Sequence, residues 1–225
     1  KLQRAGRDMP GSNWHAYFYD PDGHTNELYY GMEQIGWDGR SKPFSMHDRG
    51  FREAPQLPQM PEDEEIRAAA KRGDDLVSGS ALRDALPDAK YDVEGILLPR
   101  PFKVIKGGPI SLFVNDVDAA KRFYEQHLGL RVSEETVWQG RRCVFLRANT
   151  EHHTIALYPI ELRESLGLRP DSTTFAVGFQ VGSYRQLCEA RTFLAGRGAR
   201  FVEIPAALHP GIDYAFHALD PDGQA

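Results

Sequence analysis

The chain has 225 residues, a length that accommodates one or two domains. It carries 27 Lys and Arg against 32 Asp and Glu, a net charge of −5, and no basic block with interleaved aromatics, which argues against nucleic acid and anionic membranes as partners. No apolar run reaches the roughly 18–20 residues of a membrane span, and the N-terminal segment lacks the apolar core of a signal peptide. We expect a soluble, cytoplasmic protein that binds a small molecule or another protein.

The first predicted elements form a hairpin-like segment. Residues 14–19 and 25–30 are rich in aromatic side chains and flank the sequence DPDGH. Pro and Gly at these positions favour a tight turn, so we predict two strands joined by it.

Residues 31–61 are rich in Gly, Pro and charge and show no sustained hydrophobic period, which is typical of an extended linker. Short helices are predicted at about 62–72 and 80–86, the second ended by Pro87. The stretch EGILLPRPFKVIK then supplies apolar residues for a strand or for docking onto the next domain.

A regular order of elements begins near Gly107. The sequence predicts a strand in PISLFVN, a helix from the N-cap Asp116 to the stop at Gly129, and strands in LRVSEET, RRCVFLRA and HTIALYP. After a short helical turn at about 160–167, the strand TFAVGFQV, the helix SYRQLCEARTFLAGRG and the strands ARFVEIP and DYAFHALD start the order again. The sequence therefore predicts two β-α-β-β-β modules in tandem, the second without its final strand.

Two cysteines, Cys143 and Cys188, fall in a predicted strand and a predicted helix. Neither belongs to a CxxC motif or to a Cys/His pair at metal-binding spacing. We predict buried, reduced thiols in preference to a disulfide or a zinc site.

The beginning and the end of the chain repeat each other. PGSNWHAYFYDPDG at 10–23 and PGIDYAFHALDPDG at 210–223 align without a gap at an offset of 200 residues. Self-similarity of this kind indicates a duplicated unit. We interpret residues 1–30 as the C-terminal strands of a truncated first domain, residues 31–106 as a linker with short helices, and residues 107–225 as a second domain that lacks its final strand.

These motifs resemble the vicinal oxygen chelate superfamily, and within it the extradiol catechol dioxygenases and their glyoxalase-like relatives. The resemblance rests on ISLFVNDVDAAKRFYEQHLGL, TEHHTIALYP, VGFQVGSYRQL and above all HAYFYDPDGHTNELYYG, and it covers the chain except for the linker. It implies an α+β fold in which paired β-α-β-β-β modules form an open curled barrel around a metal.

The resemblance implies Fe(II), with Mn, Zn or Ni as alternatives, held by two His and one Glu. Glu27 stands at the place of the family's Glu ligand, and Tyr17 matches a family tyrosine that hydrogen-bonds the bound catechol or oxygen species. His15 shares a strand face with Tyr17 because alternate residues point to the same side. From the strand pattern alone, Glu27 is also readable as a solvent-facing residue, Tyr17 as a half-buried aromatic and His15 as a structural histidine.

The other histidines are predicted to have structural roles. We expect His24 to be a polar surface residue of the turn and His47 to be an exposed linker residue. His152 and His153 resemble a family pair of histidines, and we expect them to pack or to line a ligand cavity without a metal. His209 stands near the place of a further family histidine.

The second domain departs from the family where its His ligands belong. By resemblance these would fall near Pro109 and Ala176, but no His, Asp or Glu occurs in either strand. The resemblance therefore implies that residues 107–225 form a vestigial domain without metal, and that the two His ligands that accompany Glu27 lie upstream of Lys1.

The leading interpretation is an Fe(II)-dependent extradiol dioxygenase-like protein, with a catechol-type aromatic and O2 as its partners. One alternative is a metal-free binding protein of the same fold, with a cavity lined by aromatics such as Trp14, Phe18 and Phe145. Another is a glyoxalase-like isomerase or lyase that uses Zn, Ni or Co. Dimerisation is common in the superfamily, so a homo-oligomer stays open.

Overall fold

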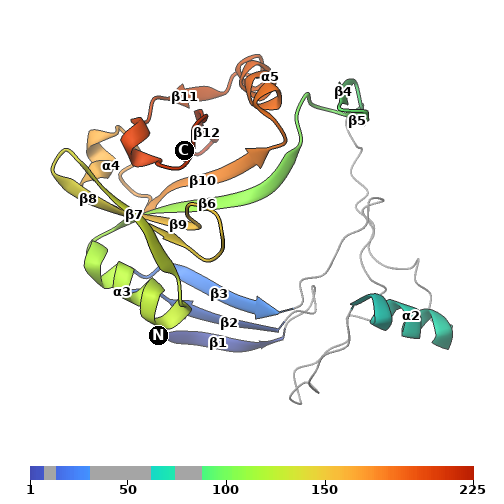
Figure 1. Cartoon of the computed structure of the whole chain (residues 1–225), viewed down its shortest axis with the longest axis horizontal. Helices are drawn as coiled ribbons and strands as arrows, with labels where there is room; N and C mark the ends of the chain where they lie inside the picture. The colour runs from blue at the N-terminus through green and yellow to red at the C-terminus, as the bar shows by residue number, and fades with distance from the viewer. Residues whose placement is uncertain (8–13, 31–61, 74–87) are drawn as a thin grey trace. The chain divides into compact units, whose positions relative to one another are not determined.

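A computed structural model of the protein (Figure 1) describes residues 1–7, 14–30, 62–73 and 88–225. The chain divides into two compact units, Lys1–Leu86 and Pro87–Ala225, which we treat separately. The second predicted linker helix and His47 lie outside the described residues. Within the described ranges no helix is long and apolar enough to cross a membrane.

The first unit contains a three-stranded antiparallel sheet in the order β1-β2-β3. Its strands are β1 (Leu2–Arg7), β2 (Trp14–Tyr19) and β3 (Thr25–Tyr30), and its helix is α2 (Glu62–Arg72). The predicted hairpin is confirmed, because DPDGH closes the turn with a hydrogen bond of 3.1 Å from the Asp20 N–H to the His24 carbonyl. The helix predicted at 62–72 is also confirmed.

The second unit follows the predicted order of elements. Its first half contains the hairpin β4 (Tyr91–Val93) and β5 (Ile96–Leu98), then β6 (Val104–Val114), α3 (Val117–Leu128), β7 (Arg131–Trp138), β8 (Arg141–Arg147) and β9 (Ile155–Pro159). Its second half contains α4 (Leu162–Ser165), β10 (Thr174–Val181), α5 (Tyr184–Ala195), β11 (Arg200–Val202), the 3-10 helix η1 (Ala206–Leu208) and β12 (His217–Leu219).

Both long helices of this unit begin at a polar cap. The Asp116 carboxylate accepts a hydrogen bond of 2.9 Å from the Ala119 N–H, and Gly129 ends α3 in the left-handed conformation at φ 72°. The Ser183 hydroxyl accepts from the Gln186 N–H at 3.3 Å and begins α5. The caps satisfy backbone groups that a helix end leaves free, so the helix limits follow from the sequence.

Five strands form the main sheet of the second unit, in the order β10-β6-β9-β8-β7. β6 runs parallel to β9 within the first module, and β10 joins antiparallel to β6 at the start of the second. The predicted α+β class is confirmed. The open curled barrel is not confirmed, because β11 and β12 pair with each other in a sheet of their own.

Two predicted strands are shorter than expected. ARFVEIP forms a strand only over Arg200–Val202, and within DYAFHALD only His217–Leu219 pair. β11 offers only Arg200–Val202 as partners, so the residues before His217 have no adjacent strand with which to continue the ladder.

The side chains of β6 alternate between two cores. Leu112 and Val114 pack with Tyr124 of α3 on one face of the sheet, and Phe113 packs with Tyr158 and neighbouring aromatics on the other. Figure 1 shows α3 on one side of this sheet and the β11–β12 pair on the other. The core that contains Phe113 also includes Leu208 of η1, which is completely buried.

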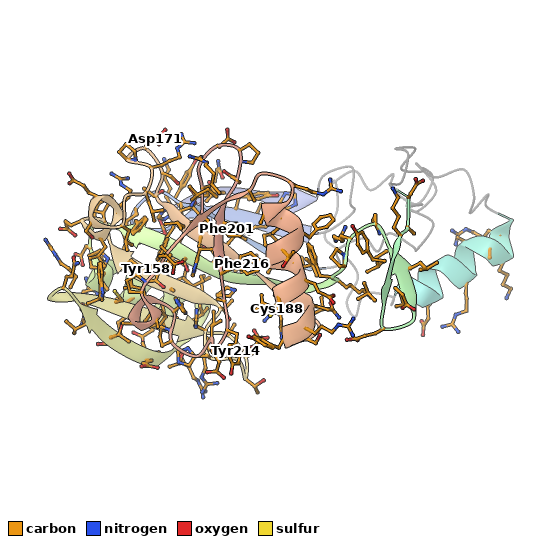
Figure 2. All side chains as sticks on the ribbon, turned by 90° about the horizontal axis from the view of Figure 1, so that it is seen from above. Tyr158, Asp171, Cys188, Phe201, Tyr214 and Phe216 are labelled. Atoms are coloured by element: carbon orange, nitrogen blue, oxygen red, sulfur yellow. The ribbon has the colours of Figure 1, made fainter. Side chains whose placement is uncertain are left out.

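The two thiols differ in their exposure to solvent. Cys143 is buried and free, as predicted, but the prediction of a buried Cys188 is wrong because this residue is exposed on α5 (Figure 2). α5 buries Gln186 and Ala190, which lie one turn apart on one face. Cys188 lies two residues from each of them, which turns its side chain to the opposite face of the helix.

Candidate functional site

The β2–β3 ladder brings the three predicted site residues onto one face. Tyr17 lies directly opposite Glu27, and His15 lies opposite Tyr29 in the next pair on the same side. The ring centroids of His15 and Tyr17 are 4.8 Å apart. His15 is only 7% exposed, Tyr17 is half-buried and the Glu27 carboxylate is exposed, so a ligand that approaches this face meets the carboxylate and the phenol.

The turn before β3 fixes the position of this face. The buried Asp20 carboxylate accepts hydrogen bonds from the backbone N–H of Asp22 at 3.0 Å and of His24 at 2.8 Å, and it also bonds the His24 Nδ1 at 2.8 Å. The bond to Asp20 raises the pKa of His24. The prediction of a surface histidine is therefore wrong, because Asp20 draws the ring onto the turn and leaves only 14% of the side chain exposed.

The second DPDG turn has the same backbone hydrogen bonds. The Asp220 N–H donates to the Gln224 carbonyl at 2.8 Å, and the Gln224 N–H donates to the Asp220 carboxylate at 2.8 Å, as the equivalent groups do around Asp20. The side chain after the turn is used differently, since the Gln224 amide donates to the carbonyls of Thr174 and Phe175 on β10 at 2.6 and 2.7 Å. The 200-residue repeat is thus a repeat of structure at this turn.

A carboxylate and an imidazole on one strand face are donors that a divalent transition metal accepts. The Fe(II) site expected from the family needs two His and one carboxylate. Across residues 1–7, 14–30, 62–73 and 88–225, no group of three His, Cys, Asp or Glu side chains is placed to hold a metal ion. The described residues therefore do not include a complete ligand set of this kind.

A second cluster of polar side chains lies in the second unit. The Glu134 carboxylate on β7 bonds the His152 Nε2 at 2.9 Å, and the His152 Nδ1 lies 2.9 Å from the His153 Nδ1. Since an ionised carboxylate can only accept, the Nε2 of His152 carries a hydrogen. A neutral His152 then accepts at Nδ1 from the Nδ1–H of His153, and the Nε2 of His153 is left as an acceptor.

Two further histidines complete this cluster. The rings of His209 and His217 lie 5.3 Å apart between centroids. Burial, followed by repulsion from His152 and His209, lowers the pKa of His153 to about 4. Burial and repulsion from His209 lower the pKa of His217 to about 4 as well. These two imidazoles are therefore neutral at pH 7.

Sequence reasoning found part of this cluster. His152 and His153 were expected to pack or to line a cavity, and both rings pack against Phe145, at 6.2 and 5.2 Å between centroids. Glu134 and His217 were missed. The 200-residue repeat places His217 at the position of Tyr17 and could have identified it, whereas Glu134 stands in no motif.

Residues 107–225 match the family model of the Glyoxalase/Bleomycin resistance protein/Dioxygenase superfamily. Since this match spans more than half of the sequence, the chain belongs to that superfamily, and the resemblance drawn from the motifs is confirmed. Among curated proteins, none matches the sequence closely enough to count as a relative.

Solved structures share the fold at low sequence identity. The 2,3-dioxygenase LapB from Pseudomonas sp. KL28 is 16% identical with a TM-score of 0.55, and the alignment covers 100% of this chain and 59% of LapB. The 2,2',3-trihydroxybiphenyl 1,2-dioxygenase from Sphingomonas wittichii strain RW1 is 19% identical with a TM-score of 0.50, and 94% of this chain and 54% of that one are covered.

A Mn(II)-bound glyoxalase from Novosphingobium aromaticivorans is 18% identical with a TM-score of 0.48, and the alignment covers 89% of this chain and 44% of the glyoxalase. The chain therefore spans between 44% and 59% of the length of these three proteins.

Proposed function

We propose that this chain is part of an extradiol-type dioxygenase that cleaves a catechol-type aromatic with O2, and that Glu27 is one ligand of its divalent metal, Fe(II). The observation that carries the proposal is the cross-strand pair of Glu27 and Tyr17, with His15 on the same face. Membership of the superfamily and the fold similarity to two dioxygenases support it.

The exposed Glu27 carboxylate offers an oxygen donor of the kind that Fe(II), Mn(II) or Zn(II) binds. The proposal requires two histidines as the remaining ligands. When bound, the metal supplies the Lewis acidity and redox activity that a reaction with O2 requires.

Tyr17 is placed to exchange a hydrogen bond with a substrate hydroxyl. Its ring lies across the strand pair from Glu27, so a catechol oxygen near the carboxylate comes within the region of the phenol. The buried His15 ring packs against Tyr17 at 4.8 Å and limits the orientations that the phenol adopts. A positioned acid or base of this kind contributes roughly 10²–10⁴-fold to a rate.

The test measures iron content and oxygen uptake with catechol after anaerobic Fe(II) loading of the protein at its natural length. We expect stoichiometric iron and rapid uptake in the unmutated protein, and loss of both in Glu27→Gln. Glu64→Gln is the matched control, because Glu64 is an exposed glutamate of α2 outside the proposed site. Tyr17→Phe is expected to keep the iron and to lower the uptake rate by about 10²-fold or more.

Other outcomes contradict the proposal. Absence of both iron and oxygen uptake in the unmutated protein would leave a metal-free binding protein as the better account. Substrate conversion under strictly anaerobic conditions would instead indicate a glyoxalase-like isomerase or lyase.

A further inference from the structure

Residues 206–212, called the cover segment below, close one side of the second-unit core. The Thr136 hydroxyl of β7 donates to the Ala207 carbonyl at 3.2 Å, and the Tyr158 hydroxyl of β9 donates to the Leu208 carbonyl. The Leu208 side chain is completely buried among core aromatics. The cover segment is therefore held by hydrogen bonds to the main sheet and by one apolar anchor.

Histidine rings support the same segment. Gly211 lies so close to His152 that a Cβ added at Gly211 would be 2.2 Å from the His152 Cγ. His209, within the segment, contacts the His217 ring of β12 and acts electrostatically on His153. The cover segment thus contributes His209 to a histidine cluster, whose other members are His152, His153 and His217.

Other titratable groups lie beside the cluster or in the core under the cover segment. β7 contributes the Glu134 carboxylate, which bonds His152. Cys143 of β8 and Tyr158 of β9 share the core with Leu208, and burial raises the pKa of both, so both stay neutral between pH 5 and pH 8. His152 and His153 come from the loop before β9, and His217 comes from β12.

Protonation opposes the closed arrangement of the cluster. His152 is the acceptor in the bond between the Nδ1 atoms, so this bond is lost when His152 is protonated, whereas His153 can take up a proton at Nε2 and keep the bond. A charge on His153 or His217 would also lie in a buried site beside His209. Opening of the cover segment relieves both problems because it returns the rings to water.

We propose that the histidine cluster makes the cover segment a pH-sensitive latch, which is closed while the rings are neutral and opens locally below about pH 6, ahead of the rest of the domain.

The direction of the pH effect follows from the linkage between protonation of the histidine rings and opening of the cover segment. The pKa of His153 and of His217 is about 4 in the closed state, below the 6.5 of a solvated histidine. The stabilisation they give to the closed state is complete above pH 6.5 and is lost as the pH falls toward 4. Between pH 7.5 and pH 5, each histidine favours opening by roughly 30-fold, and the two together by several hundred-fold when the segment opens fully.

Hydrogen exchange at pH 7.5 and pH 5.0, corrected for the intrinsic pH dependence of exchange, tests the latch. The reporters are backbone hydrogen bonds of the segment, from the His209 N–H to Ala206 at 3.1 Å and from the Ile212 N–H to His209 at 3.3 Å. We expect their protection to fall by roughly several hundred-fold at pH 5.0 while amides of α3 change by less than about 3-fold. An equal change in the segment and in α3, or no change in either, would overturn the proposal.

Variants separate the latch from general acid sensitivity. His153→Gln and His217→Gln each remove one titrating ring, so each should reduce the pH effect on the segment by roughly 30-fold. His127→Gln is the control, because His127 is exposed on α3 and contacts Phe123. Should a cluster variant fail to fold at pH 7.5, a histidine NMR titration of the unmutated protein decides the question. Two rings that titrate below pH 6 together with the loss of protection in the segment support the latch, and titration of every ring near pH 6.5 refutes it.

Discussion

Gly211→Ala tests the packing of the cover segment on the histidine cluster. Gly211 has φ 75°, and an added Cβ would meet the His152 ring at 2.2 Å and the His152 Cβ at 2.6 Å. His152 cannot move freely, because it is bonded to Glu134 on one side and to His153 on the other. The substitution therefore either displaces the cover segment or breaks the bonds of His152.

The expected cost has two parts. A non-glycine residue in the left-handed region costs about 1–2 kcal/mol. Loss of the bonds of His152 leaves the buried Nδ1–H of His153 without an acceptor, which costs about 1–3 kcal/mol of stability. We therefore expect Gly211→Ala to lower the free energy of unfolding by about 2–5 kcal/mol in urea titrations followed by circular dichroism.

Gly198→Ala is the matched control. Gly198 has φ 82°, and an added Cβ there meets nothing within 4 Å, so this variant has only the backbone cost of about 1–2 kcal/mol. Equal destabilisation by the two substitutions would refute the contact between the segment and His152.

Three further predictions concern buried polar groups and thiols. Tyr158→Phe removes the donor to the Leu208 carbonyl and should lower the free energy of unfolding by about 1–3 kcal/mol, measured in urea; no change would mean that this carbonyl finds another donor. Gln224→Ala removes two bonds to β10 and should speed hydrogen exchange at the DPDG turn, whereas unchanged exchange would show that these bonds do not hold it. One thiol, Cys188, should react rapidly with a disulfide reagent at pH 8. Cys143, whose pKa burial raises to about 11, should react only on unfolding, and two fast thiols would contradict this.

Much of the fold could be predicted because its signals are local. The caps Asp116 and Ser183, the stop at Gly129 and the Pro/Gly turn at 20–23 act through hydrogen bonds within a few residues, so the sequence shows them directly. The length of β12 depends on how many residues β11 offers as partners, and that is decided by tertiary structure. The sequence pattern alone overestimated this strand for that reason.

In the candidate site, too, the sequence predicts the local features and not those that depend on tertiary structure. The shared face of Glu27, Tyr17 and His15 follows from strand alternation and the register that the DPDG turn sets. The burial of His24 was not predictable from its place in a turn, because it depends on the bond to Asp20. The histidine cluster joins residues from the loop before β9, the segment after η1 and β12, beside Glu134 of β7, and only the fold brings them together.

The most direct test of the proposed activity follows the oxygen atoms. The protein at its natural length, loaded anaerobically with Fe(II), is given catechol and ¹⁸O₂, and the product is analysed by mass spectrometry. The account predicts a ring-opened product that carries both labelled oxygen atoms and that is not formed by Glu27→Gln. Recovery of intact catechol from the iron-loaded protein, or a ring-opened product without the label, would contradict it.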